Sequence, residues 1–335
     1  MKGRSTVLLS ILILFLSVPC GAFGQISFLN SWGGGKSGDG EFQAAQGIGI
    51  APTGDVFVAD HWGGRIEKFD HAGTFLGNIG NGLVYPAYGV AVAPNGYIYG
   101  VNHWGHQLRV FDPNGSLVDT WSGFSHPVGV AVGPSGHVYV TESGLNSDRS
   151  RVDEFDPNGS LVRSWGGLGT EPGKFHDPYG VAVAPDGDIY VADTGNNRVQ
   201  KFDSNGNFIS QWGTFGTGDG QFNMPYSVAV NAQEDLYVTD FYNDRVQKFT
   251  SLGQYILQWG SRGDGNGLFR GPTYVASRWN GSFNEVYVAE YGTYPDFGDS
   301  HVQRFMDVPE PATLSLLALG GLALLRRRRT KQEGV

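Results

Sequence analysis

Short apolar runs separated by turn-forming residues recur along most of this chain. One segment, PYGVAVAPDGDIYVADTGNNRVQKFDSNGNFISQWGT at residues 178–214, returns with few changes as PYSVAVNAQEDLYVTDFYNDRVQKFTSLGQYILQWGS at residues 225–261. Each copy contains four runs in which apolar and polar residues alternate, which is the pattern of half-buried β-strands. Triplets such as PDG and SNG separate the runs, and their Asp-Gly and Asn-Gly pairs favour hairpin turns. The pattern therefore predicts units of four antiparallel strands.

Weaker copies bring the number of units to six. They begin at Gln46, Pro86, Pro127 and Pro272. Repeated four-stranded units predict a β-propeller, in which each unit forms one blade of a ring. The second strand of the unit ends in a polar residue in every copy, at Asp60, Asn102, Glu142, Asp193, Asp240 and Glu290. We therefore predict an all-β, six-bladed β-propeller that occupies residues 26–308.

The fourth strand of the unit, which ends in Trp in most copies, is out of step with the other three. One copy, ISFLNSWGG at residues 26–34, precedes the first unit, and none follows HVQRF at residues 301–305 in the last. We therefore predict that residues 26–33 supply the missing outer strand of the sixth blade. Pairing the two chain ends in this way would leave the ring without an open seam.

The two ends of the chain differ from the repeats in composition. Lys2 and Arg4 precede an unbroken apolar run from Val7 to Val18, so residues 1–24 are typical of a secretory signal peptide. At the other end, the apolar run 312–325 is followed by four arginines. As a helix this run would span about 21 Å, less than the ~30 Å hydrocarbon core of a bilayer. It fits a weak membrane anchor with residues 330–335 as a cytoplasmic tail, or a sorting signal.

Charge and cysteine content narrow the range of partners. Without residues 1–24 and 312–335 the chain has 16 basic and 31 acidic residues, which gives a net charge of −15. A domain this acidic repels phosphate backbones, so we expect no nucleic acid partner. The single cysteine, Cys20, lies in the predicted signal peptide, so disulfide and thiol chemistry would play no part in the mature protein. We expect a monomer.

The segment YVADTGNNRVQKFD at residues 190–203 closely resembles the NHL repeat, and the resemblance extends over roughly residues 26–305. The acidic and arginine positions of this repeat are filled in four blades. The pairs are Asp60/Arg65, Glu142/Arg151, Asp193/Arg198 and Asp240/Arg245. We interpret them as structural pairs that brace a turn through charge-assisted hydrogen bonds. Blades two and six depart from the pattern, with Asn102/Gln107 and Glu290/His301.

The C-terminal segment resembles a known sorting signal, PEP-CTERM, through a Pro-Glu-Pro triplet, a short apolar helix and an arginine cluster in that order. The residues are Pro309, Glu310, Pro311, Arg326, Arg327, Arg328 and Arg329. In that family an exosortase removes the tag, here residues 309–329, from exported proteins of Gram-negative bacteria that make extracellular polysaccharide. The resemblance implies transient anchoring in the inner membrane, processing by exosortase, and a final location in the cell envelope or outside the cell.

Six of the eight histidines map to one face of the predicted ring, which carries the loop after the second strand and the loop before the first. They are His61, His103, His106, His126, His176 and His301. Neutral imidazoles that converge can bind Zn²⁺ or another divalent metal. The amidating lyases, which build a zinc site on a six-bladed ring, offer one short resemblance in His106-Gln107. The alternative, which we favour, is packing of these histidines without any cofactor.

The same face carries aromatic residues at repeated positions. Tyr88, Tyr179 and Tyr226 are equivalent residues at the start of the first strand, where the chain reaches the central channel. Trp62 and Trp104 occupy the matching loops HWGG and HWGH of adjacent blades. Such rings stack on sugars or grip a peptide through their amphipathic faces, so we predict them to be ligand-binding residues. Packing between neighbouring blades is the alternative for the tyrosines.

These patterns favour a binding protein, a rigid exported ring whose loops contact an extracellular protein, peptide or polysaccharide. One alternative is a metal-dependent enzyme, similar to amidating lyases or lactonases, that uses the histidine-rich face. A second alternative is a structural protein of the extracellular matrix. Neither an H-E-x-x-H nor a G-x-S-x-G motif occurs, and fold does not decide among these functions, so enzymatic activity stays open.

Overall fold

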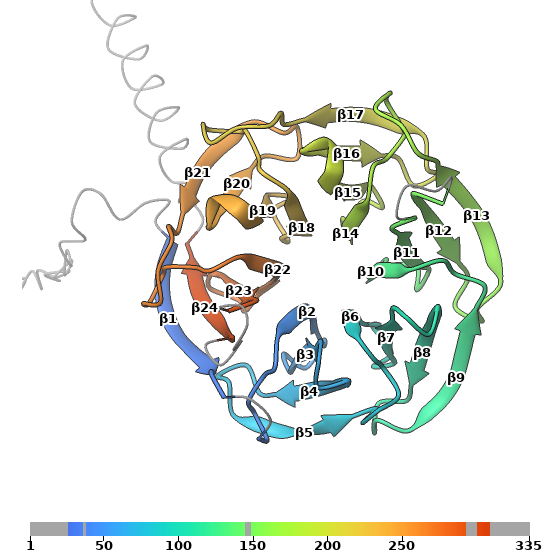
Figure 1. Cartoon of the computed structure of the whole chain (residues 1–335), viewed down its shortest axis with the longest axis vertical. Coiled ribbons are helices and arrows are strands. Elements are labelled where there is room, and N and C mark those ends of the chain that lie inside the picture. Colours follow the sequence, from blue (N-terminus) through green and yellow to red (C-terminus); the bar gives the residue numbers. More distant parts are fainter. Residues whose placement is uncertain (1–25, 36–37, 145–148, 293–299, 309–335) are drawn as a thin grey trace, which may run out of the picture. The chain divides into compact units, whose positions relative to one another are not determined.

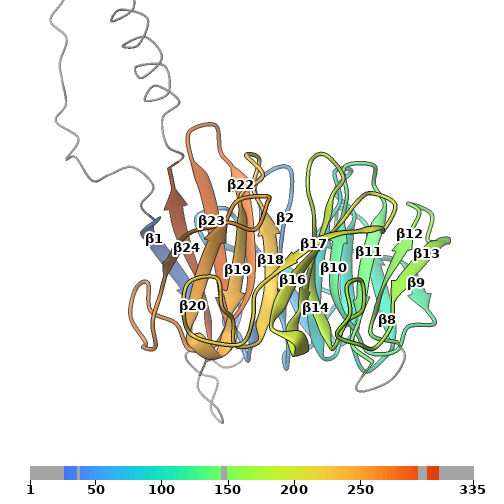
Figure 2. The ribbon, with the colours of Figure 1, turned by 90° about the horizontal axis from the view of Figure 1, so that it is seen from above.

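Six antiparallel four-stranded sheets surround a central channel in the computed structural model, which describes residues 26–35, 38–144, 149–292 and 300–308 (Figure 1). Residues Ile26–Asp307 form one unit. Figure 2 shows this ring from its edge, with the strands running between its two faces. The all-β, six-bladed prediction is confirmed.

The strands follow the chain blade by blade. Blade one contains β2 (Ala45–Ile50), β3 (Val56–Asp60), β4 (Arg65–Phe69) and β5 (Phe75–Ile79). Blade two contains β6 (Ala87–Val92), β7 (Ile98–Asn102), β8 (Gln107–Phe111) and β9 (Leu117–Ser122). Blade three contains β10 (Pro127–Val132), β11 (Val138–Glu142), β12 (Arg151–Phe155) and β13 (Leu161–Gly166).

The next two blades each add a short 3-10 turn after their second strand. Blade four contains β14 (Pro178–Val183), β15 (Ile189–Asp193), η1 (Thr194–Asn196), β16 (Arg198–Phe202) and β17 (Phe208–Trp212). Blade five contains β18 (Pro225–Val230), β19 (Leu236–Asp240), η2 (Phe241–Asn243), β20 (Arg245–Phe249) and β21 (Tyr255–Trp259). Blade six contains β22 (Pro272–Trp279), β23 (Asn284–Glu290), β24 (His301–Asp307) and β1 (Ile26–Gly33).

Blade six joins the two ends of the ring. Its strand order is β1-β24-β23-β22, and β1 pairs antiparallel with β24 from Ile26 opposite Asp307 to Gly33 opposite His301. The predicted closure by the N-terminal strand is therefore confirmed. Trp32 on β1 is half-buried, and its ring lies 5.8 Å from that of Phe69 in blade one and 6.0 Å from that of Tyr287 in blade six.

The hairpin turns form where the sequence predicts them. In the DPNGS segment of blade three, Asp156 Oδ1 accepts hydrogen bonds from the backbone N–H groups of Asn158 at 2.9 Å and Ser160 at 2.8 Å. Gly159 then takes a φ of 84°, which is a left-handed conformation that glycine adopts without strain. These turns, between the first and second strands and between the third and fourth strands of each blade, lie on one face of the ring, which we call the turn face.

The opposite face, which we call the loop face, carries the longer loops after the second strand of each blade and the connections between blades. It bears η1 and η2 and is turned toward the viewer in Figure 1. The chain ends Ile26 and Asp307, paired in blade six, belong to the turn face. The chain therefore enters and leaves the ring on the side away from the loop face.

The signal peptide predicted at residues 1–24, the sorting signal predicted at 309–329 and the tail predicted at 330–335 lie outside the described residues. Within the part of the chain that the structure describes, no helix is long and apolar enough to cross a membrane.

Candidate functional site

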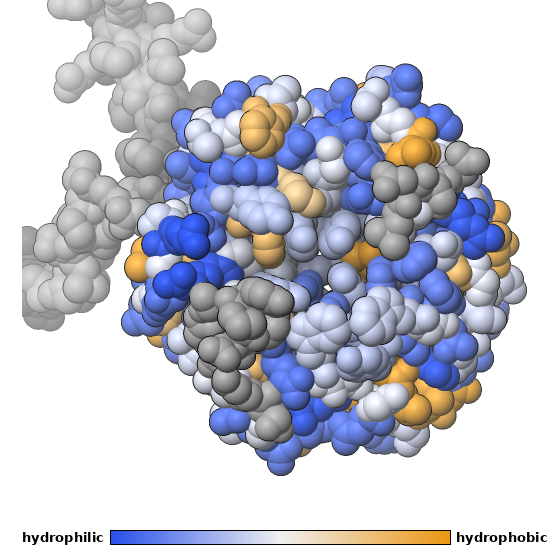
Figure 3. Space-filling view, viewed as in Figure 1, coloured by the Kyte–Doolittle hydropathy of each residue, from blue (hydrophilic) through white to orange (hydrophobic). Residues whose placement is uncertain are grey.

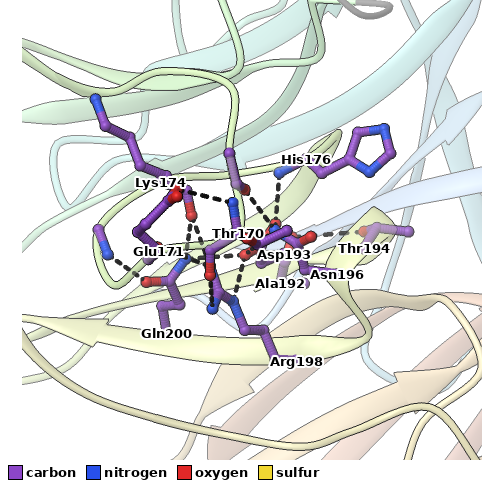
Figure 4. Close-up of polar contacts among 12 residues, drawn as sticks. Thr170, Glu171, Lys174, His176, Ala192, Asp193, Thr194, Asn196, Arg198 and Gln200 are labelled. Atoms are coloured by element: carbon purple, nitrogen blue, oxygen red, sulfur yellow. Dashed lines mark hydrogen bonds and ion pairs between the residues drawn. The ribbon is translucent and has the colours of Figure 1, made fainter.

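The acid–arginine pairs hold neighbouring blades together. In blade four the buried Asp193 accepts hydrogen bonds from Arg198 Nε at 2.6 Å and from the backbone N–H of His176 at 2.8 Å. Arg198 in turn donates to the backbone carbonyls of Thr170 at 2.7 Å and Lys174 at 2.8 Å, which belong to the connection from blade three. Figure 4 shows this network, with the His176 ring pointing away from it. Each pair therefore fastens an inter-blade connection to the blade that follows.

The other predicted pairs lie within contact distance. Arg245 Nε is 2.8 Å from Asp240 Oδ2, Arg151 Nη2 is 2.8 Å from Glu142 Oε1, and Arg65 Nε is 3.5 Å from Asp60 Oδ2. In blade six a histidine takes the place of the arginine, and His301 Nε2 lies 3.0 Å from Glu290 Oε1. In blade two the equivalent residues, Asn102 on β7 and Gln107 on β8, are paired in the sheet and are both uncharged. These contacts fit the structural role that we expected for the pairs.

His61 and His103 are buried at equivalent positions directly after the second strand. Burial lowers the pKa of each imidazole to about 4, so both are neutral at physiological pH. His103 Nδ1 lies 2.9 Å from the carbonyl oxygen of Pro127 in blade three. Thr194 makes the equivalent contact from blade four, where its hydroxyl donates to Pro225 O at 2.6 Å. His103 thus serves as an inter-blade hydrogen-bond donor through Nδ1, which leaves Nε2 as an acceptor.

His106 and His126 bring further imidazoles to the junction of blades two and three. The ring centroid of His126 lies 4.7 Å from that of His106 and 5.2 Å from that of His103. The backbone N–H of His126 donates to His106 Nδ1 at 3.1 Å, so in the neutral ring the proton sits on Nε2. Burial lowers the pKa of His126 as well.

The remaining two predicted histidines lie elsewhere on the loop face. His176 is 3.8 Å from Asp177, and His301 belongs to the Glu290 contact in blade six. The structure therefore brings His126 into contact with His103 and His106, and places His61 and His103 against the ring of Tyr88, but it does not bring all six together. Among the residues that the structure describes, no group of three or more His, Cys, Asp or Glu side chains meets the geometry of a metal site. Metal binding by these histidines stays a prediction.

The three predicted tyrosines meet at the mouth of the central channel. The ring centroids of Tyr88 and Tyr179 are 6.5 Å apart, and those of Tyr179 and Tyr226 are 4.7 Å apart. All three are half-buried, and burial raises their pKa values, that of Tyr179 to about 12. Below them the buried Tyr274 reaches across the channel, with its hydroxyl 3.4 Å from Val128 O in blade three. The tyrosines therefore pack against each other and also line the floor of the loop face.

Trp62 and Trp104 lie at the edge of this floor and form a cluster with Tyr85, which the sequence analysis missed. The three ring centroids are 5.8–6.3 Å apart. Trp104 is 56% exposed and Tyr85 is 45% exposed, so two large rings face solvent side by side. His61, whose centroid is 4.3 Å from Trp62 and 4.5 Å from Tyr88, links the cluster to the channel mouth.

Blade five extends the aromatic surface on the other side of the channel. Phe241 stacks on Tyr226 at 4.3 Å with an interplanar angle of 14°, and Tyr242 lies 4.9 Å from Phe241 and is 59% exposed. Phe241 and Tyr242 occupy the positions that hold His61 and Trp62 in blade one. Aligning the residues after each second strand would have revealed them in the sequence.

Together these rings form a continuous band on the loop face, which we call the aromatic arc. Its members are Tyr85, Trp62, Trp104, His61, Tyr88, Tyr179, Tyr226, Phe241 and Tyr242. In Figure 3, pale residues of intermediate hydropathy, the range of tyrosine and tryptophan, gather around the channel mouth over β2, β6 and β7. The turn face has its own cavity of about 530 Å³ at the channel, lined by Val, Ala and Pro residues and by Trp279.

Comparisons with known proteins agree with this architecture. The NHL repeat model matches residues 124–152, 175–202 and 222–249, and the PEP-CTERM protein-sorting motif matches residues 307–329. No curated protein sequence matches the chain significantly.

Solved structures resemble the chain in fold. A gluconolactonase from Xanthomonas campestris is 16% identical with a TM-score of 0.59, covering 79% of this chain and 86% of its own. A virginiamycin B lyase from Staphylococcus aureus is 13% identical with a TM-score of 0.55, covering 85% of this chain and 99% of its own. The hydrazine synthase of Kuenenia stuttgartiensis is 15% identical with a TM-score of 0.56, covering 80% and 96%. Identities this low establish the shared propeller fold and leave activity open.

The repeat matches fall on blades three, four and five, and the geometry of the other three blades is the same. The sorting motif begins where the last strand of the ring ends. The chain is thus an exported six-bladed β-propeller with NHL repeats in blades three, four and five and a PEP-CTERM sorting signal at residues 307–329.

Proposed function

We propose that this protein is a polysaccharide-binding module that uses the aromatic arc of its loop face. The observation that carries the proposal is the exposure of large aromatic rings at both ends of one continuous band, with Trp104 and Tyr85 at one end and Tyr242 at the other. Monomeric proteins seldom expose such rings together unless they contact a partner. Trp104, Tyr85 and Tyr242 stay 56%, 45% and 59% exposed despite their contacts with neighbouring rings.

A polysaccharide suits this surface better than a folded protein does. The C–H faces of sugar rings stack on flat aromatic side chains, while tyrosine hydroxyls and neutral histidines offer hydrogen bonds to sugar hydroxyls. The arc supplies both kinds of group, because His61, Tyr88 and Trp62 are in direct contact. Its course across several blades fits an extended chain ligand.

The placement of the chain ends supports the same role. Ile26 and Asp307, the residues next to the two chain ends, pair on the turn face, on the side of the ring away from the arc. A tether on that side would leave the arc open to ligand, and exosortase processing would remove no residue of the proposed site. We infer a final location in the cell envelope or outside the cell.

Affinity electrophoresis and calorimetry with a panel of soluble neutral polysaccharides test the proposal. Binding through the arc predicts that the double variant Tyr85→Ala/Trp104→Ala loses about tenfold or more in affinity, since each exposed ring contributes roughly 1 kcal/mol by stacking. Trp279→Ala is the matched control, because Trp279 is 40% exposed on the turn face. Absence of binding to every polysaccharide, or an equal loss in the Trp279 variant, would refute the proposal.

A metal-dependent lyase or lactonase is the second candidate, favoured by the imidazole rings of His103 and His106, whose centroids lie 5.2 Å and 4.7 Å from that of His126. Zinc titration monitored by calorimetry tests it: tight, stoichiometric binding that His126→Ala abolishes would support this candidate over the first. A role as a structural matrix protein stays a prediction that the same binding panel addresses.

A further inference from the structure

A cavity of about 460 Å³ opens on the loop face between blades five and six. Its walls come from η2, from the connection between β21 and β22, and from the residues directly after β23. The side chains that line it are Phe241, Tyr242, Asp244, Arg262, Arg270 and Tyr291. Because Phe241 stacks on Tyr226, the cavity is continuous with the aromatic arc.

Arg262 is the unusual member of this lining. The connection between blades has the same conformation three times, marked by the isolated bridges Leu168–Phe175, Phe215–Phe222 and Arg262–Phe269. The position that holds Arg262 therefore holds leucine or phenylalanine in the other two copies. The conformation of the connection does not require an arginine, so a structural role in the connection does not explain why residue 262 is an arginine.

The charges around Arg262 leave its guanidinium available. Arg270, the other cation of the cavity, is neutralised by Asp264, with Nη2 2.6 Å from Oδ2. Asp244 Oδ1 accepts a hydrogen bond from the backbone N–H of Gly271 at 2.9 Å. No described residue forms an ion pair or a side-chain hydrogen bond with Arg262, which is exposed at the cavity. An arginine in this state is a ready partner for a carboxylate, which it binds with two parallel hydrogen bonds.

We infer that this cavity recognises a uronic acid unit of an acidic polysaccharide, with Arg262 binding the carboxylate and Phe241 or Tyr242 stacking on the sugar ring. The inference rests on the proposed function and names its ligand class. The two aromatic rings stand at 85° to each other with centroids 4.9 Å apart, so they form a corner that accepts one flat ring. The carboxylate and the ring face are two features of the same sugar.

The net charge of the protein restricts the ligand further. The propeller is strongly acidic, with a net charge of −15 between residues 25 and 311. A polymer with a carboxylate on every sugar would be repelled by this field, whereas one in which neutral sugars separate the uronates would be repelled less. A polysaccharide with alternating neutral and uronic acid units therefore fits the site best.

Calorimetry on the full-length protein with a hyaluronan decasaccharide, in which glucuronate alternates with a neutral sugar, provides the test. The matched probe is the same decasaccharide after reduction of its carboxylates to alcohols. We expect the wild-type protein to bind the acidic form about tenfold more tightly, the value of one charge-assisted bidentate contact. Arg262→Leu, a residue that the fold already uses at Leu168, should abolish this preference and leave binding of the reduced form unchanged.

Lys174→Leu is the control variant. Lys174 is an exposed cation in the equivalent connection between blades three and four, at the position that holds Leu268 in the connection with Arg262. The Lys174→Leu variant loses one positive charge, as Arg262→Leu does, and should keep the tenfold preference for the acidic decasaccharide. Hexaglutamate offers carboxylates without sugar rings and should bind more weakly than the decasaccharide.

Equal affinity for the two decasaccharides, no binding of either, a preference that survives in Arg262→Leu, or tighter binding of hexaglutamate would each overturn the uronate assignment. Retention of neutral polysaccharides by the aromatic arc would still leave the proposed function standing in those cases. Loss of that retention as well would overturn both.

Discussion

Replacing Glu67 by glutamine should stabilise the ring at neutral and alkaline pH. Glu67 is buried on β4, where its Oε1 lies 2.6 Å from Arg65 Nη2. Three other blades place glutamine at the equivalent position, at Gln200, Gln247 and Gln303. The repeat itself therefore shows that the fold accepts a neutral amide here.

The magnitude follows from the cost of ionising a buried carboxylate. Burial raises the pKa of Glu67 from 4.5 to about 7, although the charge of Arg65 opposes the shift. The folded state then binds the Glu67 proton more tightly than the unfolded state, so its stability falls as pH rises from about 4.5 to about 7 and levels off above that. At about 1.4 kcal/mol per pKa unit, ionised Glu67 costs the wild-type fold on the order of 1–3 kcal/mol at pH 8.

Glutamine would also add a hydrogen bond that the wild-type blade lacks. In blade four, Gln200 Oε1 accepts from the backbone N–H of Gly173 at 2.8 Å while its Nε2 donates to Asp193 Oδ2 at 2.9 Å. Glu67 reproduces only the first contact, and the equivalent Asp60 Oδ2 is buried without a hydrogen-bond partner. A donor at residue 67 would satisfy that oxygen.

Thermal and urea unfolding of wild type and Glu67→Gln from pH 5 to pH 8.5 measures the effect. The variant should gain about 1–3 kcal/mol at pH 8 and much less at pH 5, so the two curves converge in acid. The reverse change, Gln200→Glu, should destabilise blade four at pH 8 by placing a carboxylate beside Asp193. A constant difference between wild type and Glu67→Gln at all pH values would show that ionisation of Glu67 is not the cause, and a loss of stability at pH 8 would refute the reasoning.

Three further predictions concern ring closure, processing and the channel mouth. Trp32→Ala should cost about 2–4 kcal/mol, somewhat less than the ~3–5 kcal/mol typical of a fully buried aromatic residue, because Trp32 is half-buried. Deletion of residues 26–33 should lower solubility by exposing the edge of β24, and an unchanged melting temperature in both variants would contradict closure by β1. Mature protein from the native host should lack Leu314 to Val335, and an intact mass that includes this tail on the extracellular form would contradict processing. Replacing Tyr88, Tyr179 and Tyr226 by alanine should weaken polysaccharide retention, and because these rings pack together it should also lower the melting temperature, whereas exchanging His71 and His137 on the turn face should leave retention unchanged.

Much of the fold could be predicted from the sequence because the pattern of each strand occurs in six copies of the repeat. The out-of-step Trp strand was enough to place β1 in blade six, since a ring needs four strands in every blade. The candidate site was harder to predict, because Tyr85 precedes a strand and carries no repeat signal of its own. Arg262 was missed for a different reason, because in the sequence its connection looks like a glycine-rich turn. Only the structure shows that the three inter-blade connections share one conformation and that Arg262 occupies the position of Leu168 and Phe215.

Comparison between blades also separates positions that the fold requires from positions that are free for ligand contact. The first residue after the second strand has a structural task in blades two and four, where His103 and Thr194 bond to a carbonyl of the next blade. The second residue has no such task, because blade four fills it with Gly195 and still closes its turn through η1. Trp62, Trp104 and Tyr242 occupy that free position. An exposed tryptophan that the turn does not require fits the proposed ligand-binding role, so the second position, rather than the histidines beside it, is the better place to test that proposal.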